Sequence, residues 1–126
     1  VIETDFLPVY PDMTLKEMVD TISKSNRNLF PVINQDRDLV GVVLLDDIRN
    51  IMFRPDLYRR MRVSTFMSMP PAKIEVGDSM DSVMKLFDDT GAWNLPVVEK
   101  GKYVGFVSKS KIFNSYRRVL RHYCED

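Results

Sequence analysis

The chain has 126 residues, with 18 acidic and 18 basic side chains, so its formal net charge is zero. Apolar residues make up 44% and charged residues 29%, which predicts a folded domain with a hydrophobic core and excludes a disordered segment. The longest apolar run, residues 39–45, is too short for a membrane span, which needs about 20 residues. A single cysteine, Cys124, excludes an internal disulfide, and with the single His122 it offers little for metal or redox chemistry.

The chain starts at Val1, and its first residues lack the basic and apolar regions of a secretory signal peptide. We therefore expect it to be a piece of a longer protein.

The charges are unevenly distributed along the sequence. Residues 1–99 hold 16 acids and 11 bases, whereas residues 100–126 hold 7 bases and 2 acids. Two interpretations of the basic end stay open: a solvated helix face, or a surface that meets an anion, acidic lipid headgroups or an acidic partner. The neutral overall charge and the lack of a recognised motif argue against nucleic acid as a partner.

The sequence contains one internal repeat, which is the main clue to its architecture. Residues 14–33, TLKEMVDTISKSNRNLFPVI, align with residues 79–98, SMDSVMKLFDDTGAWNLPVV. Residues 39–48, LVGVVLLDDI, then align with residues 103–112, YVGFVSKSKI. Few residues are identical, but the apolar, proline and glycine positions coincide, and these positions set the backbone. Each copy therefore predicts the same order of elements, β-α-β-β-α.

In the first copy, a short extended segment at residues 6–10 is followed by a helix that begins after Thr14. Thr14 and Glu17 have the spacing of a capping box. The apolar residues behind them share one helical face: Leu15, Met18, Val19 and Ile22. The copy continues with strands at residues 31–33 and 39–44 and a second helix at residues 46–53.

In the second copy, an extended segment at residues 72–76 leads to a helix capped by Asp78 or Ser79. The matching stripe is Met80, Val83, Met84 and Phe87. Strands follow at residues 96–98 and 103–107, and the last helix covers residues 110–123. Because these strands are apolar at nearly every position, we expect them to be buried on both faces.

One copy alone buries too little surface to be stable. We therefore predict an α+β fold in which the two β-α-β-β-α repeats pack their sheets face to face around a pseudo-twofold axis. Residues 1–60 hold the first repeat with the start of the linker, and residues 61–126 hold the second repeat with the C-terminal helix. Together they form one cooperative module.

This doubled pattern resembles a tandem cystathionine-β-synthase (CBS) domain pair, also called a Bateman module. The likeness rests on a helix followed by FPVI in one copy and LPVV in the other, then LVGVV and YVGFV, then a helix. It covers nearly the whole chain, and the doubled order is its specific feature.

Two further stretches resemble the cytoplasmic C-terminal module of prokaryotic ClC-type chloride channels and antiporters. They are the linker IMFRPDLYRRMRVSTFM and the ending GFVSKSKIFNSYRRVL. Such a parent implies a transmembrane transporter domain upstream of Val1 and a location on the cytoplasmic side of the cell membrane.

The CBS resemblance implies a ligand site, because such modules commonly bind ATP, ADP or AMP. The family signature is Gly, two hydrophobic residues, Ser or Thr, two further residues and Asp, in which Asp accepts the ribose hydroxyls and the hydroxyl donates to a phosphate beside a helix N-terminus. The first copy reads GVVLLDD: Gly41 and Asp47 match, and Leu44 replaces the hydroxyl. The second reads GFVSKSK: Ser108 matches, and Lys111 replaces the Asp.

Four more candidates follow from the same comparison. Lys109 and Lys111 flank Ser108 and suit a phosphate. Phe30 and Trp93 flank the proline-initiated strands and are candidates for covering the adenine, although large apolar residues are equally expected in a core or an interface. The candidate ligand-binding set is Phe30, Gly41, Asp47, Trp93, Ser108, Lys109 and Lys111. No catalytic residue or metal ligand is predicted.

Two functions remain open. The first is a regulatory sensor that binds an adenine nucleotide and biases the gating of an attached chloride transporter. The second is a ligand-free structural or dimerisation module of the same or another membrane transporter, which the departures at Leu44 and Lys111 favour. A nucleotide-metabolism enzyme is another conceivable parent. Catalysis by the chain itself is not expected, because it has no nucleophile–base pair, metal cluster or glycine-rich phosphate loop, and no cofactor is required.

The last helix suggests a partner, because it carries more apolar surface than one small sheet needs. Bateman modules pair through their helices, and a ClC-type parent is a homodimer, so we expect a twofold contact. The predicted interface residues are Ile112, Phe113, Tyr116 and Leu120. The basic side of the same helix is the alternative contact, with a membrane surface: Arg117, Arg118 and Arg121.

Overall fold

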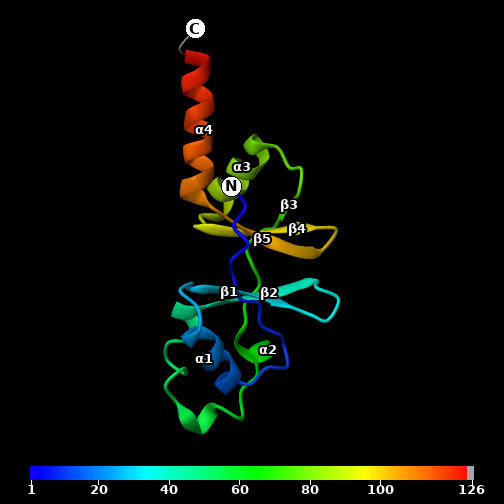
Figure 1. Cartoon of the computed structure of the whole chain (residues 1–126), viewed down its shortest axis with the longest axis vertical. Coiled ribbons are helices and arrows are strands. Elements are labelled where there is room, and N and C mark those ends of the chain that lie inside the picture. Colours follow the sequence, from blue (N-terminus) through cyan, green and yellow to red (C-terminus); the bar gives the residue numbers. More distant parts are fainter. Residues whose placement is uncertain (125–126) are drawn as a thin grey trace. The chain divides into compact units, whose positions relative to one another are not determined.

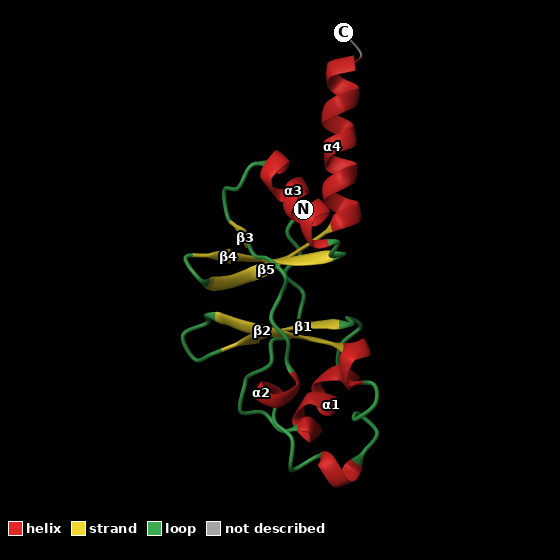
Figure 2. Cartoon of the chain, turned by 180° about the vertical axis from the view of Figure 1, so that it is seen from behind, coloured by secondary structure: helices red, strands yellow, loops and turns green. Residues whose placement is uncertain are grey.

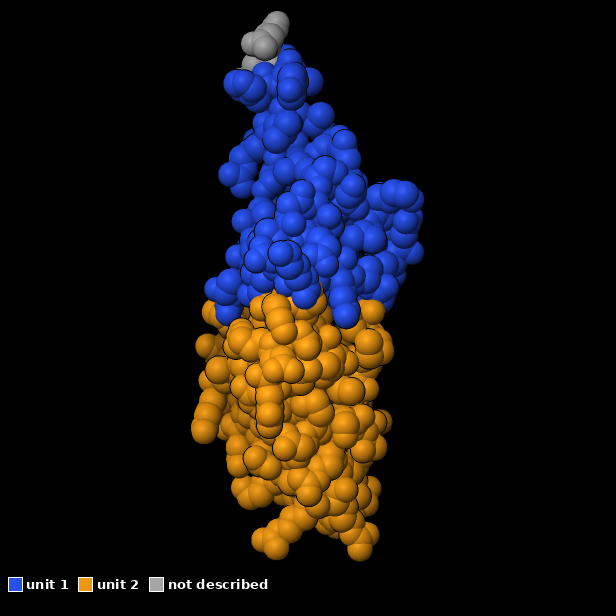
Figure 3. Space-filling view, turned by 90° about the vertical axis from the view of Figure 1, so that its right-hand side faces the viewer, with its two compact units in different colours: residues 1–4, 71–100, 104–126 blue, residues 5–70, 101–103 orange. Residues whose placement is uncertain are grey.

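The structure is a computed structural model that describes residues 1–124. It is an α+β fold with helices and two small sheets, as predicted (Figures 1 and 2). The chain divides into two compact units (Figure 3). The first-repeat unit comprises residues 5–70 and 101–103, and the second-repeat unit comprises residues 1–4, 71–100 and 104–126.

In the first-repeat unit, two strands pair in an antiparallel sheet. Strand β1 (Leu29–Ile33) is buried along its whole length, and β2 (Leu39–Leu44) is buried at most positions. The helical elements of this unit are α1 (Leu15–Ser23), a 3₁₀ turn at Leu45–Ile48, a second at Pro55–Leu57, and α2 (Val63–Phe66). Its core draws on all of these segments except the second 3₁₀ turn: Val9, Met18, Phe30, Val32, Val43, Ile48 and Val63.

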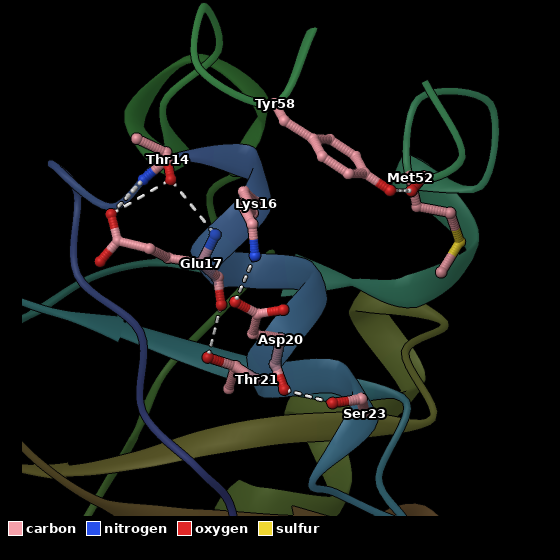
Figure 4. A network of polar contacts seen from close by, with 8 residues as sticks. All are labelled: Thr14, Lys16, Glu17, Asp20, Thr21, Ser23, Met52 and Tyr58. Atoms are coloured by element: carbon pink, nitrogen blue, oxygen red, sulfur yellow. Dashed lines mark hydrogen bonds and ion pairs between the residues drawn. The ribbon is translucent and has the colours of Figure 1, made fainter. Parts of the chain in front are cut away.

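Helix α1 begins with the predicted capping box (Figure 4). The Glu17 amide donates to Thr14 Oγ1 at 3.2 Å, and the Thr14 amide donates to Glu17 Oε1, also at 3.2 Å. These bonds satisfy N–H groups that have no partner within the helix. Of the predicted stripe, Leu15 and Met18 are fully buried.

Because the capping box closes the exposed start of α1, Thr14→Ala is expected to lower the free energy of unfolding by about 1 kcal/mol. Urea denaturation measures this loss. The matched control is Ser23→Ala, which removes a hydroxyl bonded to the Asp20 carbonyl at the other end of α1. It should cost less than about 0.5 kcal/mol. Equal losses for both variants would mean that the box adds nothing beyond an ordinary surface hydroxyl.

The predicted second helix at residues 46–53 is wrong. The chain forms a 3₁₀ turn at Leu45–Ile48 and then irregular turns. No side chain caps its start, and Pro55 disfavours the helical conformation at the preceding Arg54. The extended segment at residues 6–10 is also reduced, to a single bridge in which the Val9 amide donates to the Pro31 carbonyl at 2.9 Å.

The second-repeat unit follows its prediction closely. Its elements are β3 (Ile74–Glu75), α3 (Met80–Thr90), β4 (Asn94–Glu99), β5 (Lys102–Ser108, of which residues 104–108 belong to this unit) and α4 (Lys109–Cys124). The strands form one sheet in the order β3-β4-β5. Of the two cap candidates, Ser79 caps α3 by accepting from the Ser82 amide at 3.1 Å, while Asp78 accepts from the Glu75 amide. Gly91, with a φ of 68°, ends α3 in the left-handed conformation.

Each compact unit holds a segment that is distant in the sequence from the rest of the unit. In the second-repeat unit, Glu3 and Phe106 exchange two backbone hydrogen bonds of 2.8 and 2.9 Å. In the first-repeat unit, Ser68 and Val42 exchange an equivalent pair of 2.8 and 2.9 Å. The extreme N-terminus thus completes the sheet region of the second repeat.

Candidate functional site

The first-repeat unit places Asp47 on its surface, directly after β2. Asp47 lies in the 3₁₀ turn Leu45–Ile48 and is exposed. Within residues 1–124, its carboxylate makes no hydrogen bond or ion pair, whereas the neighbouring Asp46 pairs with Arg49. Asp47 therefore presents two acceptor oxygens that are free for a ligand with paired hydroxyl groups.

The other two signature positions of this unit have structural explanations. A Cβ on Gly41 would lie 2.9 Å from Met67 Sδ and 3.1 Å from the Ser68 carbonyl oxygen, so the glycine lets these residues approach β2. Leu44, where the signature has a hydroxyl, ends β2 with a partly exposed apolar side chain. In this unit only Asp47 retains ligand chemistry from the signature.

In the second-repeat unit, Ser108 ends β5 and caps helix α4. Its Oγ accepts a hydrogen bond from the Lys111 amide at 3.2 Å and lies 3.5 Å from Ser110 Oγ. A hydroxyl that accepts one bond retains a proton to donate. Ser108 can therefore cap the helix and still donate to an anion at the helix start.

The two lysines of this helix start have different surroundings. The ammonium of Lys111 forms an ion pair with the carboxylate of Glu3, and the side chain of Glu3 is largely buried. The ammonium of Lys109 lies 5.3 Å from the centre of the Trp93 ring and 5.8 Å from that of Phe113. Because aromatic rings hold a cation without neutralising it, Lys109 keeps its charge for an anionic ligand, while that of Lys111 is already compensated.

The two aromatic candidates occupy opposite environments. Trp93 is 74% exposed, and its carbonyl accepts from the Lys109 amide at 2.8 Å. Phe30 is 0% exposed and belongs to the core of the first-repeat unit. Phe30 therefore offers no free face to an adenine, and its role as a core residue is the one that the structure supports.

The predicted interface residues are likewise divided. Ile112 is only 4% exposed and packs in the core of the second-repeat unit, with Phe113 against it. Tyr116 is half-buried and Leu120 is exposed. Ile112 is thus unavailable to a partner, because its own chain covers it.

Two interactions of the candidate site were not predicted from the sequence. Glu3 meets Lys111 across 108 positions of sequence, and no local pattern signals such a pair. The Lys109–Trp93 contact joins the two ends of the β4-β5 hairpin. The sequence signal for this contact is that Trp93 directly precedes β4 and Lys109 directly follows β5.

The first-repeat unit also has an open hollow of about 390 Å³, lined by Tyr10, Pro11, Asp12, Asn34 and Gln35. None of the predicted ligand residues lines it.

Within residues 1–124, no helix is both long and apolar enough to cross a membrane. The same residues contain no group of three or more side chains suited to bind a metal ion.

The family model for the CBS domain matches residues 1–54 and 63–118. Inosine-5'-monophosphate dehydrogenase of Aquifex aeolicus is 29% identical over 120 residues, which are 94% of this chain but only 24% of that enzyme. The chain thus spans about a quarter of this curated relative.

Two solved structures share the fold. CBSX2 in complex with AMP is 20% identical, with a TM-score of 0.73, covering 91% of this chain and 90% of that one. The CBS domain of a bacterial CNNM/CorC family Mg²⁺ transporter in complex with ATP is 17% identical, with a TM-score of 0.76, covering 90% and 81%. Two matched copies and a common fold over nine-tenths of the chain lead to one conclusion: the chain belongs to the CBS domain family, as a tandem pair.

Proposed function

We propose that this CBS pair is a regulatory module that binds an adenine nucleotide and couples its binding to an attached membrane transport protein. The observation that carries the proposal is the exposed, unpartnered carboxylate of Asp47 at the signature position. The structures of CBSX2 with AMP and of the Mg²⁺ transporter domain with ATP support it, because proteins of this fold hold such ligands.

Each compact unit offers its own ligand chemistry. In the first-repeat unit, Asp47 is suited to accept hydrogen bonds from ribose hydroxyls. In the second-repeat unit, Ser108 and Lys109 are suited to hold a phosphate. The position equivalent to Asp47 in the second repeat is Lys111, which is already paired with Glu3. A ribose therefore has a carboxylate acceptor only at the first signature, and we expect one nucleotide per chain.

For the parent protein, we propose a ClC-type chloride channel or antiporter, with the module on the cytoplasmic side of the membrane. The linker between the repeats and the start of α4 support this assignment through their resemblance to such modules. The Mg²⁺ transporter relative supports a transport protein only in general. Regulation requires that the nucleotide bind two arrangements of the parent with different affinity.

A second candidate function is a structural module that binds no ligand. Leu44 in place of a hydroxyl and the Lys111–Glu3 ion pair favour it, because both remove ligand chemistry from the signatures.

Calorimetric titration of the 126-residue chain with ATP, ADP and AMP, with and without Mg²⁺, distinguishes the two functions. The sensor predicts saturable binding that Asp47→Ala weakens by about tenfold or more, since a hydrogen bond to a charged group contributes about 1.5–3 kcal/mol. The matched control is Asp46→Ala, which removes the same charge from the adjacent, Arg49-paired position.

Each result has a clear meaning. Binding that only Asp47→Ala weakens supports the sensor and the place of the ribose. Equal weakening by both variants would indicate a general charge effect instead. No binding of any adenine nucleotide up to millimolar concentration would favour the structural module.

A further inference from the structure

The apolar side of α4 continues beyond the part that packs on its own unit. In the first half of the helix, Ile112 is 4% exposed and α4 packs against α3. In the second half, Leu120 is 45% exposed and Tyr123 is 74% exposed. Figures 1 and 2 both show this half extending past α3, with no other element of the second-repeat unit beside it.

The sequence of α4 is amphipathic along its whole length. At 3.6 residues per turn, one stripe runs through Ile112, Tyr116, Val119 and Tyr123, with Leu120 beside it. Arg117, Arg118 and Arg121 lie on the rest of the circumference. The exposed second half therefore presents an apolar stripe on one side and three guanidinium groups on the opposite side.

These three arginines carry charges that the described chain does not neutralise. All three are exposed, and none forms an ion pair within residues 1–124. The sequence has no acid between Glu99 and Glu125, so α4 itself supplies no carboxylate partner. By contrast, Lys111 in the first half of the helix is paired with Glu3.

The charge pattern of α4 favours one of the two surfaces that could cover the stripe, which are a second α4 helix and a lipid bilayer. A twofold contact between two α4 helices through the stripe would leave the arginines facing away from it, with no acid on either helix to pair with them. A bilayer with anionic lipids supplies both requirements: an acyl boundary for Leu120 and Tyr123, and negative headgroups for the arginines. Tyrosine is also favoured at the boundary between acyl chains and headgroups.

We propose that the second half of α4, from Arg117 to Cys124, docks on the surface of an anionic lipid bilayer. The helix lies in the headgroup region, with its apolar stripe toward the acyl chains and its arginines among the headgroups. This contact is independent of the adenine nucleotide, because it uses none of the residues assigned to the ligand.

Vesicle sedimentation tests the contact with the 126-residue chain. The vesicles are phosphatidylcholine alone, or equal parts of phosphatidylcholine and phosphatidylglycerol. We expect binding to the anionic vesicles only, and loss of that binding at high salt. A combined R117Q/R118Q/R121Q variant should bind about a hundredfold more weakly, since each basic residue near such a surface contributes about fivefold. Leu120→Asp should weaken binding by about tenfold or more.

The matched control is K24Q/R59Q/R60Q, which removes three exposed basic side chains from the first-repeat unit and should leave binding unchanged. Equal loss in this control, equal binding to neutral vesicles, or no vesicle binding would each overturn the proposal. Sedimentation velocity tests whether a second copy of the chain covers the stripe instead. A solution dimer that Leu120→Asp dissociates, together with no vesicle binding, would assign the stripe to that second copy. Circular dichroism confirms that each variant retains its helix content.

Discussion

Phe30→Ala is expected to lower the free energy of unfolding by about 3–5 kcal/mol, the largest loss of any single substitution proposed for this chain. The ring of Phe30, the second residue of β1, is completely buried among side chains from α1, β2 and the 3₁₀ turn after β2. Removing it takes away the transfer free energy of the ring and leaves a cavity that a close-packed core only partly refills.

The matched comparison is Trp93→Ala, at the aromatic position that flanks the equivalent strand of the second repeat. Trp93 is exposed and its ring contacts Lys109, so its loss should cost less than about 1 kcal/mol. Chemical denaturation of both variants gives the two values. A small loss at Phe30, together with weakened nucleotide binding, would return this residue to the ligand site and contradict its placement in the core.

Phe30 shows where the sequence was ambiguous. A large aromatic residue before a buried strand is equally consistent with a core and with an adenine-binding surface, because both use apolar area. The choice depends on which segments pack over the strand. Those segments, α1 and the turn after β2, become neighbours only in the tertiary structure.

Elements with local causes were predicted well. The start of α1 follows from Thr14 and Glu17, and β2 was placed at the residues that the structure gives. The predicted helix at residues 46–53 failed because no side chain caps its start and because Pro55 disfavours helical backbone just beyond it.

Pairings between distant parts of the chain could not be predicted from the sequence. No periodicity indicates that Glu3 joins β5 and meets Lys111, because the partners are separated by more than a hundred residues. This pairing changes the candidate site, since it compensates the lysine that stands where the signature has an acid. Asp47 lies in the 3₁₀ turn after β2, where a longer helix was predicted, and Ser108 is the last residue of β5.

The second large effect is expected at Gly105, where alanine should lower the free energy of unfolding by about 2–4 kcal/mol. A Cβ at this position would lie 2.4 Å from the Glu3 carbonyl oxygen, and the contact is with backbone, which cannot rotate away. Urea denaturation measures the loss. At Gly41 the closest atom is Met67 Sδ at 2.9 Å, in a flexible side chain, and the nearest backbone atom, the Ser68 carbonyl oxygen, lies at 3.1 Å, so Gly41→Ala should cost less.

Releasing residues 1–4 from β5 would relieve the clash at Gly105, because the nearest atoms belong to Ile2 and Glu3. That release forfeits the two Glu3–Phe106 backbone bonds and the Glu3–Lys111 ion pair. The loss caused by Gly105→Ala therefore cannot exceed the loss caused by deleting residues 1–4. In the deleted chain the same substitution should cost almost nothing, since its steric partner is absent. A double-mutant cycle of the two changes measures this coupling, and additive losses would show that Gly105 is needed for a reason other than the N-terminal segment.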